Sequence, residues 1–160
     1  MAIAKLPTPS TPAGRLHEAT LHSILGYQLA QASIVTNALY TKHTAQVFDL
    51  RPAEYTLLTL VVENPGGSMA RLAKALAVSA PNITAWVDRL EKRELVVREK
   101  SESDKRTQML RATAKGIKLA SQATAKILEM EKQALKGLSA LEQYTLLELL
   151  HKVGSLRSTI

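Results

Sequence analysis

The stretch from residue 68 to residue 93 constrains the fold most, because it contains two short amphipathic segments separated by a tight turn. Ser68 and Ser79 each stand where a helix N-cap is expected. The second segment has apolar side chains at i, i+3, i+4 and i+7, the spacing of a helix face that packs on a core: Ile83, Trp86, Val87 and Leu90. Because its other face is polar, the pair of segments predicts a helix-turn-helix.

A charged hairpin is predicted directly after the second segment. Residues 95–99 and 107–111 have strand-like composition, and the residues between them are charged and turn-prone. Thr113 is placed to cap a long helix that we expect to continue to about residue 136. The hairpin would therefore connect the helix-turn-helix to a long helix.

Further helices are expected on both sides of this unit. Residues 15–47 contain no proline and one glycine, so we predict one long helix there. Pro52 and Glu54 are typical of the first turn of the next helix. Ser139 and Glu142 match a capping box before the last helix. Its apolar face is too broad for one neighbouring helix: Leu141, Tyr144, Leu146, Leu147, Leu149, Leu150, Val153 and Leu156.

Composition supports one mainly α protein of the α+β kind. Of the 160 residues, 46% are hydrophobic and 4% are aromatic, which favours helices over a strand-rich sandwich. Residues 1–14 are rich in proline, threonine and serine, and we expect a disordered tail. The starting residues lack the apolar core of a signal peptide, and no run is long enough to span a bilayer. A soluble cytoplasmic protein without membrane contact is therefore expected.

Charge points to a polyanionic partner. The net charge is +7, and residues 66–112 contain ten basic and six acidic residues. The chain has no cysteine, which excludes disulfides and thiolate metal sites. The four histidines do not show the spacing of a zinc motif, and no phosphate loop or nucleophile motif is present. We therefore predict no enzyme activity, no cofactor and no metal.

The order of these elements resembles the MarR family of bacterial winged helix-turn-helix transcription regulators. The similarity covers roughly residues 16–156. Its most specific part is the sequence LEKRELVVR at 90–98, DKR at 104–106 and LRATAKG at 110–116, which is similar to the family's wing signature.

The resemblance implies a homodimer that binds a palindromic double-stranded DNA operator. Residues 15–49 and 114–160 would form the dimerisation helices, and residues 50–113 would form the winged helix-turn-helix. The recognition helix, from Ser79 to about Arg93, would lie in the major groove and the hairpin over the minor groove. Such dimers usually repress a promoter and release it when a small ligand binds.

Two residues depart from the family pattern. Glu94 stands where glycine is common at the end of the recognition helix, and a left-handed turn there would cost ~1 kcal/mol or more. We therefore expect a reshaped helix exit. Arg51 replaces the usual Ser or Thr cap before Pro52, which makes the start of that helix uncertain by a residue or two.

DNA contacts are predicted for short polar side chains near the start of the recognition helix and for basic residues around it. Asn82 can pair with adenine, and Thr84 can contact a thymine methyl. Arg89 and Lys92 are suited to phosphates, or alternatively to surface pairs with Asp88 or Glu91. The full predicted DNA-binding set is Ser68, Arg71, Ser79, Ala80, Pro81, Asn82, Thr84, Arg89, Lys92, Arg98, Lys105 and Arg106.

The tip of the hairpin has its own predicted roles. Arg106 is expected to enter the minor groove, where narrow A·T tracts concentrate negative potential. Asp104 would repel DNA if it were unpaired. It is therefore expected to pair with Arg106 or Arg98, or else to be an ordinary solvated loop acid.

From the resemblance, a small-molecule effector is expected between the first two helices and the long helix after the hairpin. The candidate residues are His22, Gly26, Tyr27, Tyr55 and Leu58. His17 and His151 are further possible lining residues, whereas Tyr27 and Tyr55 are alternatively ordinary core residues. Family ligands are often aromatic carboxylates or related metabolites, in some branches CoA thioesters or metals.

We therefore expect a homodimeric, ligand-responsive repressor. A winged-helix module that docks an acidic protein surface is the alternative, and a small enzyme of unrecognised type is a third. Recognition of a palindromic operator in the presence of competitor DNA would separate the first from the second.

Overall fold

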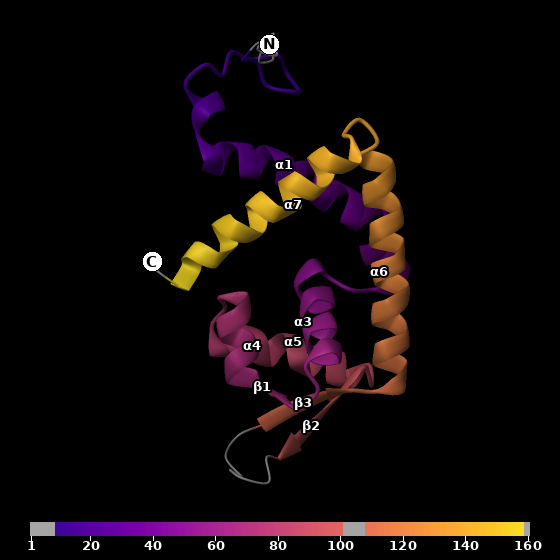
Figure 1. The fold of residues 1–160 in the computed structure, drawn as a ribbon. Helices are drawn as coiled ribbons and strands as arrows, with labels where there is room; N and C mark the ends of the chain where they lie inside the picture. The colour runs from indigo at the N-terminus through magenta and orange to yellow at the C-terminus, as the bar shows by residue number, and fades with distance from the viewer. Residues whose placement is uncertain (1–8, 101–107, 159–160) are drawn as a thin grey trace. The chain divides into compact units, whose positions relative to one another are not determined.

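The computed structural model describes residues 9–100 and 108–158 (Figure 1). The chain forms two units, residues 1–38 and residues 39–160. Most described residues are helical, and the sheet is small, which confirms the predicted mainly α fold class.

The first unit begins with a folded-back loop rather than with a helix. Ser10 pairs with His17 in an antiparallel bridge, and the Thr11 side chain accepts a hydrogen bond from the Leu16 N–H at 3.0 Å. The predicted helix start at residue 15 is therefore wrong. Local side-chain bonds compete with the helix here, and α1 (Leu25–Tyr40) begins only after a short 3-10 turn, η1 (Leu21–Ser23).

The helical run that starts with α1 continues into the second unit with one irregular turn. The π-helical turn η2 (Thr41–Ala45) is followed by α2 (Gln46–Phe48), and Asp49 then adopts a left-handed conformation with φ 48°. The run therefore ends one residue beyond the predicted end at residue 47.

Helix α3 (Pro52–Glu63) begins where proline predicted it. The Glu54 carboxylate, three residues into the helix, accepts a hydrogen bond from the Arg51 N–H at 3.0 Å, which is one of the two bonds of a capping box. Arg51 itself contributes no side-chain cap.

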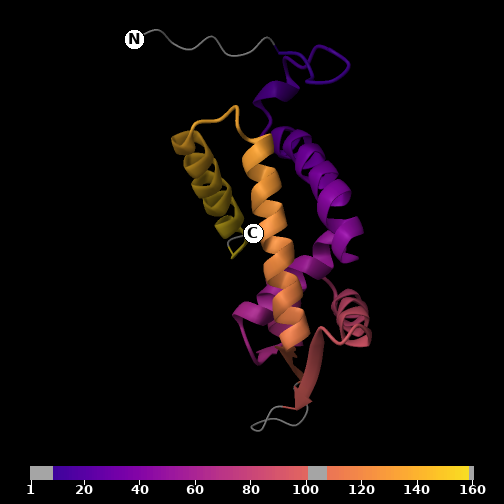
Figure 2. The same ribbon diagram turned by 90° about the vertical axis from the view of Figure 1, so that its right-hand side faces the viewer.

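The winged unit follows in the predicted order. Strand β1 (Gly67–Ser68) precedes helices α4 (Met69–Leu76) and α5 (Ala80–Lys92), and strands β2 (Val96–Lys100) and β3 (Gln108–Ala112) form the hairpin. The sheet is antiparallel with strand order β1-β3-β2, and Arg98 lies opposite Leu110. Figure 2 shows the two hairpin strands at the base of α6. The short strand β1 was not predicted.

The last two helices begin at predicted caps. Thr113 Oγ1 accepts a hydrogen bond from the Gly116 N–H at 3.0 Å at the start of α6 (Ala114–Ala134). Ser139 and Glu142 form the capping box of α7 (Ala140–Ser155), and a 3-10 turn, η3 (Leu156–Ser158), follows. Both caps confirm the sequence pattern.

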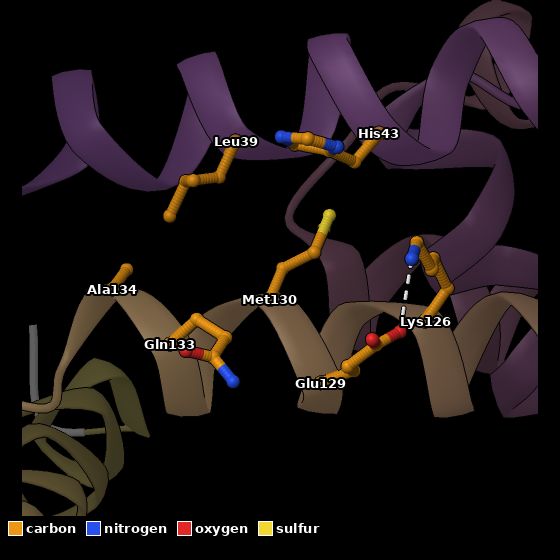
Figure 3. A pocket seen from close by; sticks show the side chains of 7 residues that line it. All are labelled: Leu39, His43, Lys126, Glu129, Met130, Gln133 and Ala134. Carbon is orange, nitrogen blue, oxygen red and sulfur yellow. Dashed lines mark hydrogen bonds and ion pairs between the residues drawn. The ribbon is translucent and has the colours of Figure 1, made fainter.

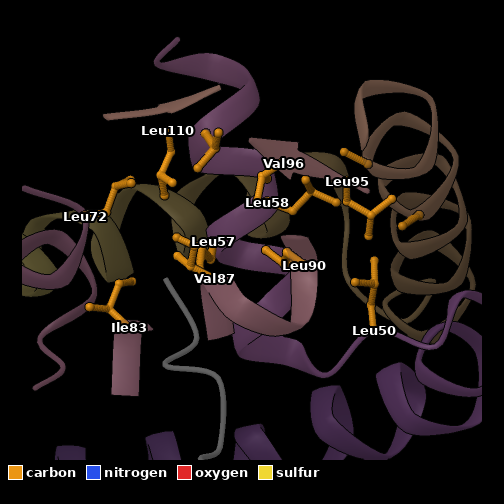
Figure 4. Packing of buried hydrophobic residues seen from close by; sticks show 13 residues of the cluster. Leu50, Leu57, Leu58, Leu72, Ile83, Val87, Leu90, Leu95, Val96 and Leu110 are labelled. Carbon is orange, nitrogen blue, oxygen red and sulfur yellow. The ribbon is translucent and has the colours of Figure 1, made fainter. Parts of the chain in front are cut away.

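One hydrophobic core joins α3, α5 and the sheet (Figure 4). Leu57 and Leu58 of α3 and Val87 of α5 have no exposed surface, and Leu90 and Leu95 are 1% exposed. Because the same side of α5 supplies Ile83, Val87 and Leu90 to this core, its other side is left for solvent.

Candidate nucleic-acid interface

The interface is built on the turn between α4 and α5. Ser68 caps α4 by accepting a hydrogen bond from the Arg71 N–H at 3.3 Å. Ala77 ends α4 in a left-handed conformation with φ 52° and so turns the chain toward Ser79. The helix-turn-helix predicted from the sequence is thus present.

The first turn of α5 exposes the side chains predicted to contact bases. Ser79 occupies the N-cap position but makes no capping hydrogen bond. Its side chain is exposed to solvent. Asn82 and Thr84 are exposed as well. Thr84 donates its hydroxyl hydrogen to the Ala80 carbonyl at 2.9 Å, so its methyl group and its oxygen lone pairs remain for a ligand.

Arg89 has a partner that the sequence did not indicate. Its Nε lies 2.9 Å from Oε1 of Glu54, and the Glu54 side chain is 1% exposed. The predicted alternatives, a surface pair with Asp88 or Glu91, are therefore wrong, because those acids face a different arginine. The Arg89 side chain as a whole is 39% exposed.

That other arginine is Arg98, at the start of the hairpin. It pairs with Asp88, and its Nη1 lies 3.3 Å from Oε2 of Glu91. Its guanidinium is thus neutralised by two acids of α5, and Arg98 stabilises the wing against the recognition helix. The predicted tip residues Asp104, Lys105 and Arg106 lie outside the described residues.

Both helices of the helix-turn-helix carry an exposed basic side chain, Arg71 in α4 and Lys92 in α5. Arg71 and Lys92 are exposed, and neither is paired with an acid that the structure describes. Arg111 on β3 is held by Glu99, with the Nε atom 2.9 Å from Oε1, and this contact raises the pKa of Arg111. The arrangement offers polar groups at the helix start and unpaired cations beside them, as a DNA groove and its phosphates require.

The predicted effector residues are distributed over the two units. In the first unit, Tyr27 donates a hydrogen bond to Glu18 at 2.5 Å, which raises the pKa of Tyr27, and His22 lies 3.5 Å from the same carboxylate; Gly26 is exposed in α1. Neither neighbouring histidine is buried in this unit, because His17 is exposed and His22 is half-buried.

In the second unit, the Tyr55 hydroxyl lies 2.8 Å from the Thr124 hydroxyl of α6, and its ring centroid lies 6.0 Å from that of Tyr40. Leu58 has no exposed surface and belongs to the core. It is therefore a packing residue that a ligand reaches only if the core opens.

A cavity of about 380 Å³ was not predicted at all. It is lined by Leu39, His43, Lys126, Glu129, Met130, Gln133 and Ala134. Figure 3 shows Leu39 and His43 facing Met130 across it, with Lys126 and Glu129 joined at 2.9 Å on α6. Lys126 lowers the pKa of Glu129, chiefly through this hydrogen bond, and His43 adds a smaller effect. Sequence spacing gave no indication of this cavity, because its two sides are more than 80 residues apart.

The described part of the chain contains neither a cluster of metal-ligating side chains nor a membrane-spanning helix. No group of three or more His, Asp or Glu side chains there is arranged to hold a metal ion. No helix in that part has the length and apolarity needed to cross a bilayer.

Comparisons with known proteins agree with this geometry. A protein of Thauera aromatica assigned to transcriptional regulation of the hcr operon is 27% identical over 129 residues, which are 81% of this chain and 78% of that protein. The transcriptional repressor CouR, solved bound to a 23-mer DNA duplex, has a TM-score of 0.80 at 29% identity over 87% of this chain and 98% of the other.

The fold is also that of the PcaV regulator of Streptomyces coelicolor, solved with its natural ligand. The TM-score is 0.75 at 21% identity, over 84% of this chain and 94% of that one. The MarR family model matches residues 50–107, from the junction before α3 into the hairpin. The winged helix-turn-helix of this chain thus matches the model of the MarR family of DNA-binding transcriptional regulators, and the relatives named above are similar to the chain over most of its length.

Proposed function

We propose that this regulator is a homodimeric repressor that binds a palindromic operator and leaves it when a small molecule binds. The observation that carries the proposal is the first turn of α5, which exposes Ser79, Asn82 and Thr84 on a helix whose opposite side is fixed in the core. The likeness to CouR, whose structure contains a DNA duplex, supports this role for the helix. Regulators of this family are generally not enzymes.

Each predicted DNA residue has a proposed role. Asn82 pairs with a base, and Ser79, Ala80, Pro81 and Thr84 shape the contact in the major groove. Ser68 and Arg71 at the start of α4, together with Arg89 and Lys92 of α5, bind phosphates. Lys105 and Arg106 contact the DNA at the minor groove, and Arg98 supports the wing.

Dimerisation is proposed through residues 15–49 and 114–160, with residues 50–113 as the DNA-binding part. Large apolar side chains of α7 and of the turn η3 that follows it are between 37% and 74% exposed: Leu141, Tyr144, Leu146, Leu147, Leu149, Leu150, Val153 and Leu156. An exposed apolar helix face of this extent is costly in a monomer and favourable in an interface.

The proposed effector is an aromatic carboxylate or a related metabolite, free or as the acyl group of a CoA thioester. The cavity beside His43 supports this class, because its volume is of the size of small-molecule sites and it combines apolar walls with the Lys126 ammonium group. A ligand carboxylate would compete with Glu129 for this ammonium group. His22, Gly26, Tyr27, Tyr55 and Leu58 remain the alternative lining residues.

The DNA proposal is tested by footprinting the protein on the region upstream of its own gene, with competitor DNA present. Two protected half-sites about one helical turn apart are expected. Asn82→Ala should weaken binding by ~1 to 3 kcal/mol and relax the preference at one base pair of each half-site. Equal binding of competitor DNA would instead favour the interaction module.

The effector proposal is tested by repeating the footprint with a panel of aromatic acids and their CoA esters. The acid that abolishes protection should lose most of its effect on the Lys126→Met variant, while Lys132→Met, which changes an exposed lysine of the same helix, serves as the matched control. If both variants respond as the unmodified protein does, the cavity is not the effector site.

A further inference from the structure

Two helix ends meet at residues 48–54, which run from the last residue of α2 to the first turn of α3. We call this segment the junction. The run from α1 to α2 ends at Phe48, where the last carbonyls of a helix lack partners, and α3 starts at Pro52, where the first N–H groups lack partners. Both ends are satisfied by side chains that connect to α5.

Arg93 closes the first of these ends. Its Nη2 donates to the Phe48 carbonyl at 2.9 Å, and its Nη1 donates to the Asp49 carbonyl. Nη1 also lies 3.6 Å from the Asp49 carboxylate. A guanidinium at a helix C-terminus is favoured by the helix dipole, and its planar fork fits two adjacent carbonyls. Arg93 directly follows α5, so this contact fixes the end of the recognition helix to the junction.

Glu54 connects the second end. One oxygen accepts the Arg51 N–H at 3.0 Å, and the other lies 2.9 Å from Nε of Arg89 in α5. Because this side chain is 1% exposed, these two contacts replace the water that a carboxylate would otherwise bind. Leu50 of the junction and Leu90 of α5 also belong to the same hydrophobic core (Figure 4).

We propose that Glu54 and Arg93 are positioning residues for DNA recognition, which hold the second half of α5 on the junction and thereby aim its first turn at the groove. Neither residue contacts DNA in this role. The inference rests on the proposed use of α5 as the recognition helix. If Arg93 holds α5 in this way, a shift of the helix end at Phe48 is transmitted to α5.

The test separates positioning from phosphate binding by the dependence of affinity on salt. Arg93→Gln and Glu54→Gln should each weaken operator binding about tenfold, the loss expected for a charged hydrogen bond, without changing the slope of log affinity against log salt. Lys92→Gln removes the same charge one residue away from an exposed, unpaired position, and should lower that slope by about one. Arg93→Lys, which keeps a donor for the carbonyls, should recover most of the binding lost in Arg93→Gln.

Hydrogen exchange of the DNA-free protein provides the second readout. In Arg93→Gln, amide exchange should accelerate at residues 48–54 and 88–93 and remain unchanged along α6. Binding within twofold of the unmodified protein, a salt slope reduced by about one, or unchanged exchange would each overturn the proposal. If the unmodified protein protects no upstream DNA, the proposed function fails, and the exchange data still decide whether the contact to the junction exists.

Discussion

Replacing Gly116 with alanine should destabilise the protein through a backbone clash at the base of the wing. A Cβ at this position would lie 2.0 Å from the Leu95 carbonyl oxygen and 2.9 Å from the Leu95 carbonyl carbon. The same oxygen accepts the Thr113 N–H at 3.0 Å. Because the obstacle is main chain rather than a flexible side chain, α6 and the start of β2 have to separate.

The magnitude follows from what that separation breaks. Overpacking of this kind costs ~1 to 3 kcal/mol, and loss of the hydrogen bond between Thr113 and Leu95 adds ~1 kcal/mol. The Thr113 cap, which binds the Gly116 N–H, is weakened as well. Alanine regains at most ~1 kcal/mol over glycine in a helix. The expected net loss is about 2 to 4 kcal/mol, or roughly 5 to 15 °C in Tm for a chain of this size.

Urea unfolding followed by the fluorescence of Trp86, the single tryptophan, measures this loss. Protein concentration is held constant, because the stability of the proposed dimer would depend on it. Gly137→Ala is the matched control, since a Cβ there would have nothing within 4 Å. If Gly116→Ala lies within ~0.5 kcal/mol of the unmodified protein, the close approach of α6 to Leu95 is not a constraint on the wing.

Three further predictions concern the helix exit, the Tyr40 hydroxyl and α7. Glu94→Gly should stabilise the protein by up to ~1 kcal/mol in the same urea assay, because Glu94 has φ 59°; a loss of stability would contradict this. Burial raises the pKa of Tyr40 above its ordinary 10.0, so the stability it contributes is present below pH 10 and is lost as the pH rises further. Tyr40→Phe should cost ~1 kcal/mol at neutral pH, because the bond to the Leu50 carbonyl at 3.1 Å is lost, and should flatten the alkaline decline in a series of thermal melts. Leu147→Lys should yield a monomer in sedimentation at micromolar concentration, whereas Thr145→Lys on the polar face of α7 should not; a dimeric Leu147→Lys would exclude α7 from the interface.

Local rules predicted the caps and the order of the elements. Ser68, Thr113 and Ser139 act within three residues of their own positions, so their sequence neighbours specify the bond. The stripe of Ile83, Val87 and Leu90 was likewise predictable, because helical spacing alone places these residues on one face.

Contacts between distant segments were not predictable in the same way. Glu54 was expected in the first turn of α3, and it lies there, but its partner Arg89 is 35 residues away and becomes a neighbour only when α5 packs on α3. The same holds for Arg98 with Asp88, which local charge patterns assigned to other partners. The start of α1 was misplaced because the Thr11 side chain stabilises a turn that hydrophobic periodicity does not describe.

The exit of the recognition helix shows how tertiary structure overrides a local preference. We expected Glu94 to reshape this exit, and that expectation was wrong. The Leu95 N–H bonds to the Leu90 carbonyl at 2.9 Å and the Glu94 N–H to the Glu91 carbonyl at 2.8 Å, the two bonds of a Schellman motif with Glu94 in the usual glycine position.

The residues beyond the exit explain why its shape is kept. Leu95 is 1% exposed and packs in the core with Leu90, the apolar contact that accompanies this motif. The Glu94 carbonyl also accepts the Thr113 hydroxyl at 2.7 Å. A different exit would withdraw Leu95 from the core and Thr113 from its bond, at a cost well above the ~1 kcal/mol of left-handed strain. The strain at Glu94 is therefore retained because the core and α6 together fix where the wing begins.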